Sequence, residues 1–185
     1  KVMLAAADTE VPDDCAVLVL AGPKTPLFEN EVEKIENYLN KGGKVLLMAD
    51  TDAPADYNGL VADLGIEIGN DIIVDVSGIG QLFGAGPTMP IVSNYGDHAI
   101  VNDFGGMMTI FPEARSVRED SPPSGVSVTE VAKTTGQSWA ETGDLATGEV
   151  AFDQNEDRQG PITVLAVAEK DAENPPETDN QYGLD

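Results

Sequence analysis

The segment between residues 16 and 50 constrains the fold more than any other part of the sequence. It begins with Ala16-Val-Leu-Val-Leu-Ala21, a short apolar run that predicts a strand buried on both faces. The next apolar residues are spaced as on one face of a helix: Phe28, Val32, Ile35 and Leu39. Lys41-Gly42-Gly43 ends that helix, and Val45–Met48 predicts a second buried strand.

A strand, a helix and a strand with short connections predict a right-handed parallel crossover. We therefore expect a three-layer α/β fold with a mainly parallel sheet and long irregular loops. The 185 residues suffice for one good core, so a single domain over residues 1–168 is predicted, with an acidic, proline-containing tail over residues 169–185. We expect the domain to continue beyond both ends of this sequence.

Further elements are predicted along the chain from the same patterns. A short helix is expected over residues 55–64, and Gly78–Pro90 is expected to form a mobile loop. Strands are predicted over five segments: Ile66–Ile68, Ile72–Val76, Met107–Phe111, Gly125–Ala132 and Ile162–Ala168.

The charge of the chain restricts its partners. There are 33 acidic and 10 basic residues, for a net charge of -23. Such a surface repels nucleic-acid backbones and anionic lipid head groups, so neither class of partner is predicted. The acidity is typical of a solvated shell in a saline or extracytoplasmic setting, and a basic partner is the alternative.

The residues favour no familiar catalytic centre of the cysteine or serine type. Cys15 is the only cysteine and precedes a strand, whereas a nucleophilic cysteine sits on a tight turn between strand and helix. His98 is the only histidine, and nothing in the sequence links it to Cys15. No Gly-x-Ser-x-Gly elbow occurs.

Asp50-Thr51-Asp52, at the end of the second predicted strand, is the strongest candidate for catalysis. Paired aspartates at this place are typical of phosphotransferases of the haloacid dehalogenase type, in which one carboxylate attacks phosphorus beside a magnesium ion. Pro54 stands where that family usually has threonine or valine, so a turn and a helix cap are the alternative. Asp153 opens a loop like that of an EF-hand, but Arg158 and Val164 break the motif, so a solvated turn is expected and no metal site is predicted; weak calcium binding by the acidic loop is the alternative.

Gly22-Pro23-Lys24 lies where open α/β sheets bind ligands, beyond the carboxyl end of a strand. Lys24 could meet an anion there, but the loop has neither the Walker pattern nor a dinucleotide fingerprint, so no cofactor is predicted. The segment from Tyr95 to His98 could place the titratable imidazole of His98 near a cleft. The alternative is that the histidine packs within the structure through hydrogen bonds. Trp139 is a candidate platform for a carbohydrate or a partner, or else a ring that closes the core.

Several pieces of the sequence resemble one family in the same order. They are "VLVLAGPKTPLFENEVEKIENYLNKGGKVLLMAD", "DLGIEIGNDIIVD", "NYGDHAIVNDF", "TIFPEARSV", "SWAETGD" and "DRQGPITVLAVA". The chain resembles the extracytoplasmic domain of GldG-like proteins, auxiliary components of uncharacterised ABC-type transport systems linked to gliding motility. It departs from the family pattern at Phe28, where a polar cap is more usual, and at Thr51, where proline is more usual.

The resemblance implies a Rossmann-like or glutamine-amidotransferase-like fold on the extracytoplasmic (periplasmic) side of the cytoplasmic membrane. It implies membrane helices outside this sequence, an ABC permease and an ATPase as partners, and no known catalytic residues. We therefore expect a noncatalytic interaction or ligand-sensing domain whose recognition edge surrounds Lys24 and Asp50. A hydrolase or phosphotransferase that uses Asp50 and Asp52, and a weak carbohydrate-binding module, are the alternatives.

Overall fold

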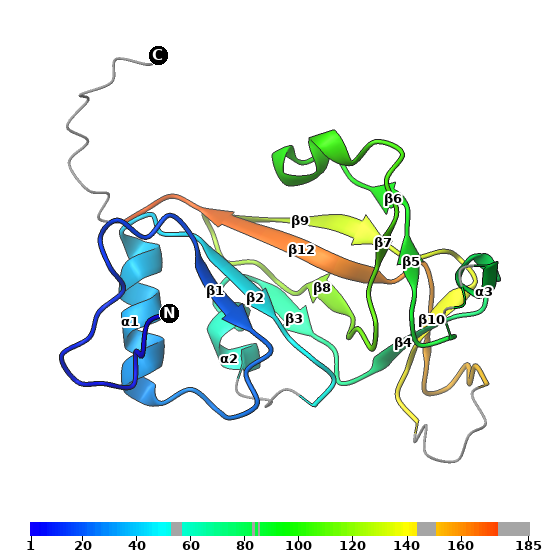
Figure 1. The fold of residues 1–185 in the computed structure, drawn as a ribbon, viewed down its shortest axis with the longest axis horizontal. Helices are drawn as coiled ribbons and strands as arrows, with labels where there is room; N and C mark the ends of the chain where they lie inside the picture. The colour runs from blue at the N-terminus through cyan, green and yellow to red at the C-terminus, as the bar shows by residue number, and fades with distance from the viewer. Residues whose placement is uncertain (53–56, 83, 85, 144–150, 174–185) are drawn as a thin grey trace.

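A computed structural model describes residues 1–52, 57–82, 84, 86–143 and 151–173 of the chain (Figure 1). The elements follow in chain order: β1 (Leu18–Ala21), α1 (Glu29–Asn40), β2 (Val45–Met48), α2 (Tyr57–Ala62), β3 (Ile66–Ile68), β4 (Ile72–Asp75), α3 (Ile79–Leu82), β5 (Ile91–Val92), β6 (Asn94–Tyr95), the 3-10 helix η1 (Ala99–Phe104), β7 (Thr109–Ile110), β8 (Val117–Glu119), β9 (Val126–Lys133), β10 (Ser138–Glu141), β11 (Arg158–Gln159) and β12 (Thr163–Lys170). No described helix has the length and apolar character needed to cross a membrane.

The predicted unit of strand, helix and strand at the N-terminal end is confirmed. β1 and β2 pair in parallel, with Leu18 opposite Val45 and Ala21 opposite Met48. Helix α1 begins after Phe28, which has no polar side chain to cap it. The backbone N–H of Phe28 donates to the Glu31 carboxylate at 2.9 Å, so Glu31 supplies one half of a capping box. Short loops join β1 to α1 and α1 to β2, as predicted for a parallel crossover.

One face of the parallel pair packs against both early helices. Ile35 of α1 is fully buried, and Leu60 of α2 lies in the same apolar cluster as Leu18 and Val45. The N-terminal segment joins this cluster because the buried ammonium of Lys34 donates to the backbone carbonyls of Leu4 at 2.9 Å and Ala6 at 2.7 Å. The first core therefore lies on a single side of β1 and β2.

Burial of these strands on both faces, which the apolar run predicts, is wrong. Exposed and half-buried residues alternate along β1 and β2. The relative exposure is 48% for Val17, 49% for Val19, 42% for Leu46 and 46% for Met48. Nothing in the described part of the chain covers this second face as a third layer would.

The prediction of a mainly parallel, three-layer Rossmann-like or glutamine-amidotransferase-like sheet is also wrong. Strands pair antiparallel everywhere in the described structure except at β1 and β2, and they form several small sheets. Their orders are β11-β10-β4, β12-β9-β6, β3-β8 and β5-β7. A parallel pair needs a long crossover, usually a helix, whereas the described chain after α3 contains only the short 3-10 helix η1, so its strands return and pair antiparallel.

β3 has the predicted bounds, the other four predicted strands are present with shifted ends, and α3 lies within the predicted mobile loop. A second core forms around β4, β10 and β12, where Ile73, Ala140 and Ile162 are fully buried. Buried hydroxyl groups of Thr134 and Ser138 lie 2.6 Å apart there, and the backbone N–H of Ile162 donates to Thr134 Oγ1 at 2.8 Å. The buried hydroxyl groups of Thr134 and Ser138 thus find hydrogen-bond partners inside the protein.

Candidate functional site: the charged edge beyond β1 and β2

The chain after β1 and the chain after β2 meet at one edge of the parallel pair. Gly22, Pro23 and Lys24 follow β1, and Asp50 and Asp52 follow β2. The backbone N–H of Gly22 donates to the Met48 carbonyl at 2.9 Å, so the register of the strands continues into the loops. The structure thus brings Lys24 and Asp50 together at this edge.

Lys24 lies between the two carboxylates. Its Nζ is 2.7 Å from Asp50 Oδ2 and 2.5 Å from Asp52 Oδ1, and all three side chains are more than half exposed. The hydrogen bonds to Asp50 and Asp52 raise the pKa of Lys24 from 10.5 to about 12. The hydrogen bond from Lys24 in turn lowers the pKa of Asp52 below its usual value of 3.8. The three groups together carry one net negative charge at neutral pH.

Backbone geometry brings the loop of Gly22 close to Asp50. Gly22 has a φ of +54°, and a Cβ at this position would lie 2.9 Å from Asp50 Oδ2. Side chains other than glycine are strained in this left-handed region. The buried Tyr57 of α2 donates its hydroxyl to the Thr25 carbonyl at 2.6 Å, which fixes the loop on its other side.

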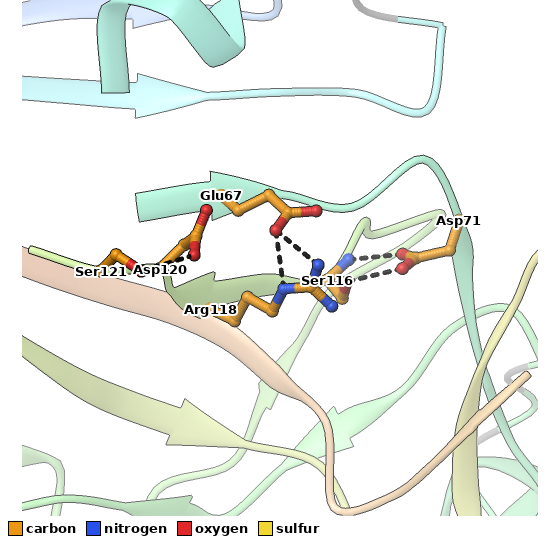
Figure 2. Close-up of polar contacts among 6 residues, drawn as sticks. All are labelled: Glu67, Asp71, Ser116, Arg118, Asp120 and Ser121. Atoms are coloured by element: carbon orange, nitrogen blue, oxygen red, sulfur yellow. Dashed lines mark hydrogen bonds and ion pairs between the residues drawn. The ribbon is translucent and has the colours of Figure 1, made fainter. Parts of the chain in front are cut away.

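The backbone of Asp50 is anchored by the segment Ala114–Ser116. Asp50 and Ala114 form an isolated antiparallel bridge. The Ser116 backbone N–H donates to Asp71 Oδ1 at 2.8 Å, and the Ser116 hydroxyl donates to Asp71 Oδ2 at 2.6 Å (Figure 2). Asp71 thereby ties the turn between β3 and β4 to the segment that holds Asp50.

Arginines on either side of Ser116 reinforce this anchor. Arg115 is buried, and its Nε donates to the Gly69 carbonyl at 2.5 Å. Burial lowers the pKa of Arg115, and the negative charge of Asp71 opposes that shift. Arg118 pairs with Glu67 across β3 and β8, as Figure 2 shows. Asp71 was not singled out from the sequence. Arg115 was singled out only as part of a resembling piece, and nothing local marked either as a support of the edge.

Tyr95 and His98 lie away from the charged edge, on β6 and at the start of η1 (Figure 1). The Tyr95 hydroxyl is 2.7 Å from Thr109 Oγ1, and its ring meets Phe104 edge-on at a centroid distance of 5.3 Å. His98 Nδ1 accepts the backbone N–H of Ile100 at 3.2 Å, and its Nε2 is 3.8 Å from Glu169 Oε2. Both side chains hold local structure together.

Trp139 is a core residue of β10, at the opposite end of the molecule from α1 (Figure 1). It is 6% exposed, its indole Nε1 donates to Glu141 Oε2 at 2.9 Å, and its ring contacts Phe152 at a centroid distance of 6.2 Å. Glu141 Oε1 accepts the backbone N–H of Gly143 at 2.8 Å. The ring therefore offers no open face on which a carbohydrate could stack.

The remaining candidates for chemistry do not converge in the described part of the chain. Cys15 is half-buried against the first core, and its carbonyl accepts the Tyr38 hydroxyl at 3.0 Å. Asp153 and Asp157 form a turn: the Asp157 backbone N–H donates to the Asp153 carbonyl, and the Asp153 backbone N–H donates to the Asp157 carboxylate. Among the described residues no three histidine, cysteine or acidic side chains gather as metal ligands would. The edge that holds Lys24, Asp50 and Asp52 is the predicted site that the structure assembles.

Comparison with known families decides the affiliation. Residues 2–178 match the sequence profile of a family described as an ABC-type uncharacterized transport system, ABC_transp_aux. The chain belongs to this family. Its members are auxiliary components of ABC-type transport systems, and the profile spans the charged edge as well as both cores. No curated protein matches the chain.

A solved structure shows where this fold occurs elsewhere. The mmIFT52 N-terminal domain is similar in fold, with a TM-score of 0.55 and 20% sequence identity. The aligned region covers 66% of the present chain and 57% of that chain. At this identity the likeness shows a shared fold over the aligned part.

Proposed function

We propose that this domain is a noncatalytic interaction or ligand-sensing module of its ABC-type transport system. The meeting of Lys24, Asp50 and Asp52 at one exposed edge carries the proposal, because it places three charged groups on a surface that a partner can reach. The edge is held from three sides, by the tight turn at Gly22, by Tyr57 and by the bridge to Ala114. Exposed ion pairs add little to the stability of a fold. Charged groups that are exposed and fixed in position are therefore better explained by recognition of a partner.

In this proposal the domain lies on the extracytoplasmic, periplasmic side of the membrane, and its partners are the permease and the ATPase of the same system. Gliding motility is the process that the GldG-like pieces of the sequence favour. The net charge of -23 supports a protein or small-molecule partner over nucleic acid. Membrane attachment would use helices outside the residues described.

A charge reversal tests the proposed edge in the full-length protein assembled with its transport subunits. Lys24→Glu places a third carboxylate between Asp50 and Asp52 and is expected to weaken assembly at least tenfold, measured by binding to the purified permease complex. Lys41→Glu, an exposed lysine at the end of α1, is the matched control and should leave binding unchanged. Equal binding by both variants and the wild type would overturn the assignment of this edge.

A magnesium-dependent hydrolase or phosphotransferase remains the rival, because one observation favours it. The carboxylates of Asp50 and Asp52 converge on a common ammonium group and do not point apart. That convergence is compatible with the arrangement of a nucleophile and a proton carrier. A phosphatase activity in magnesium buffer that disappears in Asp50→Asn, with the fold intact by circular dichroism, would establish the rival and refute the noncatalytic proposal.

A further inference from the structure

The uncovered face of the parallel pair is a continuous apolar surface, which we call the open face. It consists of Val17, Val19, Leu46 and Met48, each between 42% and 49% exposed. Val19 lies directly opposite Leu46 in the register, and Met48 lies opposite Ala21. Val17 directly precedes β1, so the open face runs across two adjacent strands and this preceding residue. α1 and Leu60 of α2 cover the other face of the same strands.

Such a face is unusual for parallel strands. Parallel strands occur almost only where helices cover both faces of their sheet, and their sequences are accordingly apolar on both sides. Ala16–Ala21 has that composition, yet the described chain supplies cover on one side only. Contiguous exposed apolar residues mark interaction surfaces when a polar rim surrounds them.

We infer that the open face binds one amphipathic helix of a partner protein, through apolar residues on that helix flanked by lysine or arginine. The size of the face indicates a single helix. Four residues of strand extend about 13 Å, and two strands with their side chains are about 10 Å wide. This matches about nine residues of one helix, whose diameter is about 10 Å.

The same dimensions argue against a second copy of this chain as the occupant. A stable interface needs roughly 800 Å² from each partner, whereas a face of this size offers on the order of 100 to 200 Å². Two copies would also bring together surfaces that each carry a net charge of -23. The helix therefore makes one contact within a larger assembly.

The charges around the open face select a basic helix. Asp13 and Asp14 lie in the turn before β1, and Asp50 and Asp52 lie in the loop after β2, where the single ammonium of Lys24 is shared between them. Lys44, just before β2, adds a second positive group. Four carboxylates against two ammonium groups leave the rim acidic, in keeping with the whole chain.

Photo-crosslinking in the full-length protein in its native cells tests this inference. A photoreactive amino acid replaces Leu46, and in a matched control it replaces Met108, which is 53% exposed on another part of the chain. Mass spectrometry then maps the crosslinked segment. The expected result is a crosslink from position 46, absent from position 108, to a segment of another protein that has helical apolar periodicity and flanking basic residues.

Variants of a neighbouring residue show whether the open face itself makes the contact. Val19→Thr retains a strand-forming residue, and Val19→Lys adds a repelling charge; crosslinking from position 46 should fall several-fold in the first and at least tenfold in the second. Ile110→Lys, at a residue that is 48% exposed, should leave the yield unchanged. Melting temperatures equal to that of the wild type establish that the variants are folded.

Three results would overturn the inference. They are crosslinks between two copies of this chain, crosslinks only to segments that are not helical or not basic, and the absence of any protein crosslink from position 46. A mapped basic helix would uphold the inference whichever protein contains it, whereas the proposed function is tested by the charge reversal at Lys24. The two proposals therefore fail separately.

Discussion

The parallel unit of β1, α1 and β2 and the antiparallel region of β4, β10 and β12 treat their apolar residues differently. In the antiparallel region all four residues of β10 are buried, and buried hydroxyl groups find partners inside the protein. In the parallel unit one face is packed, and the other exposes Val19 and Leu46 to solvent. The comparison teaches that the antiparallel region is organised for stability, whereas the parallel unit retains surface for contact.

Truncation of Trp139 should have the largest effect, because it removes the main buried ring of the antiparallel region. Trp139→Ala is expected to lower the free energy of unfolding by about 3 to 5 kcal/mol, since it leaves a cavity and removes the indole partner of the buried Glu141. Urea denaturation measures the loss, and Trp139→Phe isolates the contribution of the hydrogen bond. A loss below about 1 kcal/mol would place the stabilising core elsewhere.

Replacement of Lys34 probes the packed side of the parallel unit. Lys34→Met removes the ammonium that donates to the carbonyls of Leu4 and Ala6, so we expect a loss of about 1 to 3 kcal/mol. Amide hydrogen exchange should accelerate in residues 3–9 before it does in β10. Lys41→Met, at an exposed residue, is the control, and equal effects of the two changes would contradict this reading of the N-terminal segment.

Gly22→Ala separates backbone strain from crowding at the charged edge. A left-handed alanine costs roughly 1 to 2 kcal/mol, and its Cβ would also press on Asp50 Oδ2. Gly78→Ala shares the positive φ but meets nothing within 4 Å, so it reports the strain alone. Thermal denaturation of both variants should show the larger loss at Gly22. Equal losses would show that the Asp50 side chain moves aside without cost.

Polar substitution on the open face should barely change stability. Val19→Thr and Leu46→Thr, at half-exposed residues, are each expected to stay within about 0.5 kcal/mol of the wild type. Val74→Thr, at a fully buried residue of β4, should cost about 1 to 3 kcal/mol in the same urea titrations. Comparable losses of unfolding free energy at all three residues would contradict the proposed difference between the two regions.

The smallest expected effect concerns pH at the charged edge. Because the pKa of Asp52 is lowered in the folded protein, its ion pair stabilises the fold above pH 3.8 and loses that contribution as the pH falls further. The stability difference between the wild type and Asp52→Asn should therefore shrink below about pH 4. It should also shrink in 1 M salt, because Lys24 and Asp52 are exposed. A difference that grows in acid would contradict the pairing.

Local sequence patterns were sufficient to predict the order of elements in the parallel unit. They were insufficient elsewhere, because the strands there pair with segments distant in the sequence. The spacing of Val32, Ile35 and Leu39 and the glycines after Lys41 identify α1 without reference to the rest of the chain. β10 was missed because Ser-Trp-Ala-Glu has no alternating pattern: all four of its residues are buried, so side chains on both faces are covered. Its hydrogen-bonded neighbours in the sheet are β4 and β11. The antiparallel architecture depends on such pairings, which no local window contains.

The charged edge was predictable only where it depends on local sequence patterns. Parallel neighbours must end at one edge, so the meeting of Lys24 with Asp50 followed from the pattern of strands. Its support by Ala114, Ser116 and Asp71 depends on a contact between segments more than 40 residues apart, as the sequence separation of 45 between Asp71 and Ser116 illustrates. Sequence patterning carries no trace of that contact.

The open face also has an evolutionary consequence. A half-exposed valine or leucine that touches nothing is free to drift toward polar residues over generations, because its loss leaves the fold intact. If a helix covers Val19 and Leu46 in the assembled protein, related chains should keep those positions apolar while half-exposed apolar residues such as Ile110 vary. The history of substitution at a few surface positions would then record a contact that the isolated domain does not contain.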